Sequence, residues 1–115
     1  GLQHPLLRRL AEEAPRHRPP EPPDLLVVRL GEPLMPPQRA VIGGRLLPSA
    51  VLEITPGRAA LEVARGWGYR GPTLCLVGGG PGRGPLLAFL AALAGLGLLV
   101  SVVYVEPKYD DVEWS

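Results

Sequence analysis

A group of alternating glycines and one later glutamate are residue types that could together hold a nucleotide-like ligand. Gly80, Gly82 and Gly84 alternate in the stretch GPGRG, shortly after the apolar run TLCLV. Glycine lets a backbone approach a ligand where a Cβ would collide, and a helix that begins after such a turn offers unpaired N–H groups to an anion. Glu106 follows Gly84 by 22 residues, and an acid at the end of a strand can accept hydrogen bonds from ribose hydroxyls. We therefore predict that these four residues bind an adenosine-containing cofactor.

The same glycines also fit a turn that binds nothing. The chain has 15 glycines in 115 residues, so a G-x-G-x-G run can arise by chance. The dinucleotide fingerprint G-x-G-x-x-G cannot be read from residues 78–85. A purely structural turn therefore stays open as an alternative.

The segment after the glycines can be interpreted in two ways. Residues 84–105 are 22 uncharged residues, and about 20 suffice for a membrane-spanning helix. Within them, however, residues 86–96 contain no β-branched residue, whereas VSVVYV at 100–105 has four valines in six. This order favours a strand, a glycine loop, a helix and a second strand over a single span at 85–105. We expect the strands at about 73–78 and 98–105 to be parallel and adjacent.

Shorter patterns organise the rest of the chain into a small α/β, Rossmann-like domain with a parallel β-α-β unit at 73–106 and a β-rich N-terminal half. Residues 1–24 are expected to form a helix that ends at Pro15 and a proline-rich connector. Residues 25–115 are expected to form one α/β domain. Its strand candidates are LLVVRL at 25–30, a hairpin with Gly43 and Gly44 at its tip, and AVLEI at 50–54. Thr55 and Pro56 favour the start of a helix that ends at Gly66.

The composition excludes several classes of function. The chain has twelve Lys and Arg residues and eleven Asp and Glu residues, so it lacks the excess of positive charge that would favour binding to nucleic acid. His4 and His17 have no partners at metal-ligand spacing, so no metal site is expected. Cys75 is the single cysteine, which excludes a disulfide framework within the chain and favours a reducing, cytoplasmic location. No nucleophile with a paired base is recognisable, so the catalytic residues are unknown.

The glycine segment resembles the first motif of class I S-adenosylmethionine-dependent methyltransferases, most closely the protein arginine methyltransferases that make symmetric dimethylarginine. That motif is a hydrophobic strand followed by G-x-G-R-G-P-L, and LVGGGPGRGPL has Gly80, Gly82, Arg83, Gly84, Pro85 and Leu86 in the same order. The end of the family's second strand is matched by VVYVEPK with Glu106. The resemblance covers about 35 residues. It implies a loop at 80–84 around the methionine moiety of S-adenosylmethionine and Glu106 on the ribose.

This chain differs from the family in the acidic residues, including those that would hold a substrate. Gly78 stands where methyltransferases often have an acid, and Asp110, Asp111 and Glu113 come too early to replace the family's two-glutamate loop. We therefore expect a cofactor-binding unit that does not transfer methyl groups alone and that works with a protein partner or as a homo-oligomer. Whether the chain is an enzyme stays open. The alternatives are a non-catalytic α/β assembly or regulatory module, and a single-span membrane subunit.

Overall fold

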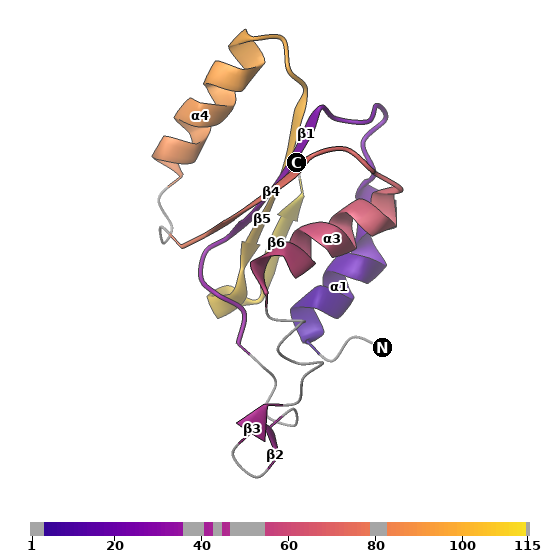
Figure 1. The fold of residues 1–115 in the computed structure, drawn as a ribbon, viewed down its shortest axis with the longest axis vertical. Coiled ribbons are helices and arrows are strands. Elements are labelled where there is room, and N and C mark those ends of the chain that lie inside the picture. Colours follow the sequence, from indigo (N-terminus) through magenta and orange to yellow (C-terminus); the bar gives the residue numbers. More distant parts are fainter. Residues whose placement is uncertain (1–3, 36–40, 43–44, 47–54, 79–82, 115) are drawn as a thin grey trace.

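The computed structural model describes residues 4–35, 41–42, 45–46, 55–78 and 83–114 (Figure 1). A four-stranded sheet lies at its centre, with strand order β4-β1-β5-β6. The strands are β1 (Leu25–Leu30), β4 (Thr73–Val77), β5 (Val100–Glu106) and β6 (Asp111–Trp114). The helices are α1 (Pro5–Glu13), α3 (Pro56–Trp67) and α4 (Gly84–Gly95). Strands β1, β4 and β5 are parallel, and β6 is antiparallel to β5. The predicted α/β class is confirmed.

The predicted adjacency of the two strands around α4 is wrong. Strand β1 lies between β4 and β5 and pairs in parallel with both, so β4 and β5 share a direction without touching as a pair. The reason is the residue pattern of β1, whose residues 26–30 are all buried. A strand covered on both faces is stable in the middle of a parallel sheet, whereas the more exposed β4 occupies the edge.

One face of the sheet is covered by α1 and α3 (Figure 1). The inward side chains of the strands and the apolar stripes of both helices form one buried cluster, which includes Leu7, Leu10, Leu26, Val63 and Val103. Residues of α1 thus belong to the same core as the sheet. After α1 a short 3-10 helix covers Ala14–His17, and the proline-rich segment that follows contains no helix or strand up to β1.

Helix α4 lies over the opposite face of the sheet and is covered far less. Only Leu86 of this helix is buried, and it packs with Val27, Val102 and Tyr104. Figure 1 shows α4 standing apart from the other two helices, on its own side of the sheet. The molecule therefore has one thick apolar core and one thin one, and the thin one adjoins the predicted site.

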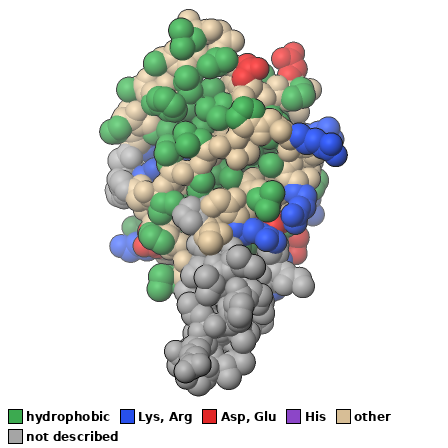
Figure 2. Space-filling view, viewed as in Figure 1, with side chains coloured by type: hydrophobic (Ala, Val, Ile, Leu, Met, Phe, Trp, Pro, Cys, Tyr) green, Lys and Arg blue, Asp and Glu red, His purple; other side chains and the backbone are tan. Residues whose placement is uncertain are grey.

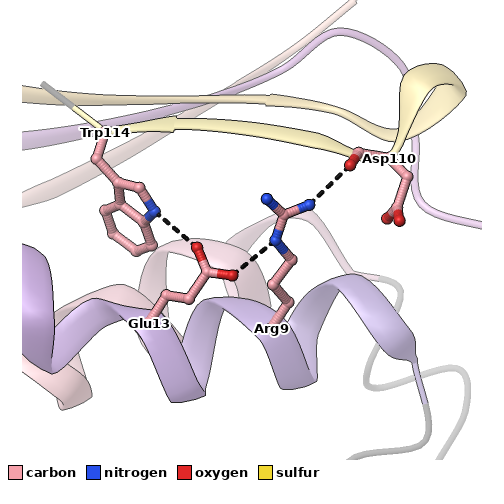
Figure 3. A network of polar contacts seen from close by, with 4 residues as sticks. All are labelled: Arg9, Glu13, Asp110 and Trp114. Atoms are coloured by element: carbon pink, nitrogen blue, oxygen red, sulfur yellow. Dashed lines mark hydrogen bonds and ion pairs between the residues drawn. The ribbon is translucent and has the colours of Figure 1, made fainter.

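The beginning and the end of the described chain are joined by polar contacts (Figure 3). Glu13 of α1 accepts hydrogen bonds from the Arg9 guanidinium at 2.7 Å and from the Trp114 indole at 3.2 Å. Arg9 also donates to the backbone carbonyl of Asp110 at 2.7 Å. These contacts fix α1 against β6, the last strand, which the sequence patterns did not reveal.

Several local predictions can be compared directly with these elements. The expected hairpin is present as β2 (Val41–Ile42) and β3 (Arg45–Leu46), while its tip at Gly43 and Gly44 lies outside the described residues. The predicted strand at 50–54 also lies outside them. Residues 85–105 are divided into α4, a turn and β5, so they do not form one span. Among the described residues, no helix has the length and apolar character needed to cross a membrane.

Candidate functional site

The carboxyl ends of β4, β1 and β5 meet at one edge of the sheet, because the three strands are parallel. The residues after them are joined by backbone hydrogen bonds: Gly78 donates to Leu30, and Gly31 donates to Val105, both at 2.9 Å. Gly78 has a φ of 96°, a conformation that side chains with a Cβ rarely adopt. The chain thus turns sharply where β4 ends. In open α/β sheets this edge is the usual place for ligands.

The predicted cofactor residues are only partly within the described structure. Gly80 and Gly82 lie outside it. Gly84 is the first residue of α4 and Glu106 is the last residue of β5, as the sequence predicted. The guanidinium of Arg83, the residue before Gly84, lies over the ring of Tyr104, which is two residues before Glu106 on the same face of β5.

Glu106 is held by a cation that the sequence analysis missed. The Arg29 guanidinium lies 3.0 Å from the Glu106 carboxylate, and the two side chains are only 4% and 19% exposed. Arg29 is two residues after Val27, so it lies on the α4 face of β1. The signal was present in the sequence, because Arg29 is the one charged residue in LLVVRL. Such a residue in a central strand needs a partner, and Glu106 supplies it.

Gly31 makes room for this ion pair. A Cβ placed on Gly31 would collide with a carboxylate oxygen of Glu106 and would lie 2.7 Å from its Cδ. The carboxylate therefore packs directly against the backbone where β1 ends. The absence of a side chain at Gly31 allows Glu106 to reach Arg29.

Arg83 forms a second polar group on the same face. Its guanidinium lies 3.9 Å from the centre of the Tyr104 ring and 2.8 Å from the Glu113 carboxylate. The hydrogen bond to Glu113 raises the pKa of Arg83 and lowers the pKa of Glu113. These contacts anchor the residue before α4 to β5 and β6.

An apolar cavity of about 580 Å³ lies between the first turns of α4 and the strands β4 and β1. Its volume is within the range of small-molecule sites, which is about 300–1,000 Å³. Among the residues that the structure describes, Arg29 is the only charged one in its lining, and the others are Leu74, Leu76, Gly78, Pro85, Leu86 and Phe89. The cavity thus adjoins the ion pair and the start of α4.

The outer surface of α4 and of the turn after it is apolar and exposed. Figure 2 shows hydrophobic side chains gathered over the part of this face where α4 lies, with charged side chains mainly toward the margins. Leu96 is 77% exposed, and Leu87, Leu98 and Leu99 are also exposed here, whereas the partly exposed Phe89 belongs to the cavity lining. Large exposed apolar patches on soluble domains commonly mark surfaces that bind another molecule.

Nucleophiles and metal ligands contribute little to this face. Cys75 lies on the other face, packed against the thick core, and burial raises the pKa of its thiol to about 11. It is therefore protonated at neutral pH and poorly reactive. No group of three or more His, Cys, Asp or Glu residues that could hold a metal ion occurs among the residues that the structure describes.

No protein-family model, no curated protein and no solved structure matches this chain.

Proposed function

We propose that the carboxyl edge of the sheet binds an adenosine-containing cofactor, with S-adenosylmethionine as the first candidate. The observation that carries this proposal is the contact of Arg83, the residue before α4, with Tyr104, which lies on the same face of β5 as Glu106. The resemblance of residues 80–86 and 106 to methyltransferase motifs supports the choice of cofactor. The single thiol is compatible with a cytoplasmic protein, which we include in the proposal.

The role of Glu106 in this proposal is to accept hydrogen bonds from ribose hydroxyls. An ionised carboxylate has about four acceptor positions, and the hydrogen bond from Arg29 is to the oxygen Oε1. The contact with Arg29 at 3.0 Å fixes the orientation of the Glu106 carboxylate. The ribose would then approach from the end of β5, while the N–H groups at the start of α4 would face the polar part of the ligand.

Isothermal titration calorimetry with S-adenosylmethionine, its demethylated product and adenosine tests this function. Glu106→Ala should weaken binding about ten- to a hundred-fold, because a charged hydrogen-bond partner contributes about 1.5–3 kcal/mol. Glu12→Ala, at an exposed position of α1, is the matched control and should bind as the parent does. Absence of binding heat for all three ligands at millimolar concentration would exclude the proposal.

We expect no methyl transfer by this chain alone. An arginine acceptor is held by carboxylates opposite its guanidinium, since bidentate pairing fixes its plane. At the described edge, Glu106 is engaged by Arg29 and Glu113 by Arg83, so neither is poised to hold a substrate guanidinium. A radiolabelled methyl-transfer assay with histone-like acceptors should give no signal above a control without protein, and turnover would contradict this expectation.

A second candidate function is an assembly module that pairs through α4, and the exposed apolar surface of that helix favours it. We propose a second copy of the chain as the partner, because an uncharged helix can pack against its own copy without charge repulsion. Light scattering after size-exclusion chromatography should show a dimer that Leu96→Glu dissociates. Met35→Glu, at a position 72% exposed and outside α4, is the control and should leave the dimer intact. A parent chain that stays monomeric at high micromolar concentration would exclude this function.

A further inference from the structure

We propose that the cavity under α4 is a separate binding site for an uncharged, apolar small molecule with one hydrogen-bond acceptor. This site goes beyond the proposed cofactor site, because the described residues of its walls are mainly leucines of β4 and α4 and Phe89, and Glu106 is not among them. The ligand class is an aliphatic or aromatic molecule with a hydroxyl or carbonyl group.

The cavity lies on the less covered side of the sheet, under α4. The contacts of Arg83 with Tyr104 and Glu113 fix the start of α4 toward β5 and β6. The β4 side of the sheet is consequently less covered, and Leu74 and Leu76 remain partly exposed. Protein interiors normally close apolar gaps by packing side chains into them. A space of about 580 Å³ between apolar walls therefore offers a ligand contacts that the chain does not make for itself.

The balanced charge at the cavity favours binding of a neutral ligand over a charged one. Of the lining residues that the structure describes, Arg29 alone is charged, and its charge is balanced by Glu106 at 3.0 Å. A ligand carboxylate would gain little from a neutralised guanidinium and would lie near the Glu106 carboxylate. A ligand ammonium group would be desolvated beside Arg29. A guanidinium carries only hydrogen-bond donors, so the polar group that suits this position is an acceptor.

Binding can be measured with the neutral fluorescent dye N-phenyl-1-naphthylamine and the parent chain at low micromolar concentration. We expect saturable binding of one dye per chain, with displacement by 1-decanol and displacement at least about tenfold weaker by decanoate and by decylamine. That ratio corresponds to 1.4 kcal/mol. Displacement by all three compounds at equal concentrations would overturn the proposed ligand class.

Two substitutions separate the cavity from the outer surface of α4. Phe89→Glu places a charge in the cavity wall at a side chain that is already 43% exposed, so the fold should tolerate it. It should weaken dye binding at least about tenfold, since an unpaired charge is unfavourable against an apolar ligand. Leu96→Glu carries the same charge at the end of α4, outside the cavity lining, and should bind as the parent does. Equal losses in both variants, or none in Phe89→Glu, would show adsorption to the surface and overturn the proposal.

Failure of the cavity site and failure of the cofactor site give different experimental results. Glu106→Ala is expected to weaken binding of the adenosine compounds, whereas Phe89→Glu is expected to weaken binding of the dye. A chain that binds dye but no adenosine compound would exclude the cofactor function and keep the cavity site. The reverse pattern would exclude the cavity site alone.

Discussion

Gly31→Ala is expected to destabilise the chain through the ion pair between Arg29 and Glu106. The added methyl group would occupy the position of a Glu106 carboxylate oxygen. That carboxylate is the end of a flexible side chain, so it can rotate away without moving the backbone. The cost is then the loss of its contact with Arg29, whose side chain is only 4% exposed.

The magnitude follows from the exposure of the two partners. Removing one partner from a fully buried ion pair costs about 3–5 kcal/mol, whereas a hydrogen bond to a charged group contributes about 1.5–3 kcal/mol. Glu106 is 19% exposed, so water can partly replace the contact and the lower range applies. We expect a loss of about 2 kcal/mol in the free energy of unfolding. For a domain of this length this lowers the melting temperature by about 8 °C.

Thermal and urea unfolding followed by circular dichroism measure this change in the free energy of unfolding. A control substitution and a double-substitution experiment then show whether the change comes from the ion pair. Gly57→Ala adds the same methyl group where nothing lies within 4 Å, so it should be neutral or slightly stabilising in α3. In a Glu106→Ala background, Gly31→Ala should cost less than about 0.5 kcal/mol, because its target is already gone. Additive losses from the two substitutions would refute the reasoning, since they would place the effect of Gly31 outside the ion pair.

Three further predictions concern single residues. Gly78→Ala should cost about 1–3 kcal/mol in urea unfolding because of the φ of 96°, whereas Gly84→Ala, where a Cβ meets nothing, should be tolerated; equal costs would contradict this. With a pKa of about 11, the thiol of Cys75 should react slowly with iodoacetamide at pH 9 in the folded chain and quickly in urea. The free energy of unfolding should fall as the pH rises above 9, because the thiol ionises more readily in the unfolded chain. Equal reaction rates in the folded and unfolded chain would contradict burial of the thiol. Burial acts to raise the pKa of Glu13, but the hydrogen bond from Arg9 and other contacts outweigh it and lower this pKa. The stabilisation by Glu13 is thus present above the usual carboxyl range and is lost as the pH falls, so Glu13→Gln should flatten the acid side of a stability curve, and an unchanged acid side would contradict it.

Local residue patterns were sufficient to predict the helices and most strands. Pro56 fixes the start of α3, and the change from residues without β-branching to valines separates α4 from β5. The class of the fold follows from this order of elements. The strand β6 was missed because DVEW is only four residues long and follows a turn in which Asp110 has a φ of 47°.

Strand order and the partner of Glu106 could not be predicted from local patterns. Both depend on which strand occupies the centre of the sheet, and this is decided by packing between segments far apart in the chain. The insertion of β1 between β4 and β5 brings Arg29 to Glu106, which is 77 residues away in sequence. The cavity was likewise unpredictable, because it results from how the anchored start of α4 lies over the sheet. An arginine within an apolar strand was the one sequence signal that could have indicated the ion pair.

The central claim is that the carboxyl edge of the sheet binds a cofactor, and amide chemical-shift mapping by NMR tests it most directly. Titration of the ¹⁵N-labelled chain with S-adenosylmethionine should shift the amide signals of Gly31, Gly78, Gly84 and Glu106 in a saturable way. Amides of α1 and of the buried stripe of α3 should stay in place, because they lie on the other face of the sheet. Unchanged spectra at millimolar ligand, or shifts confined to α1 and α3, would contradict the account.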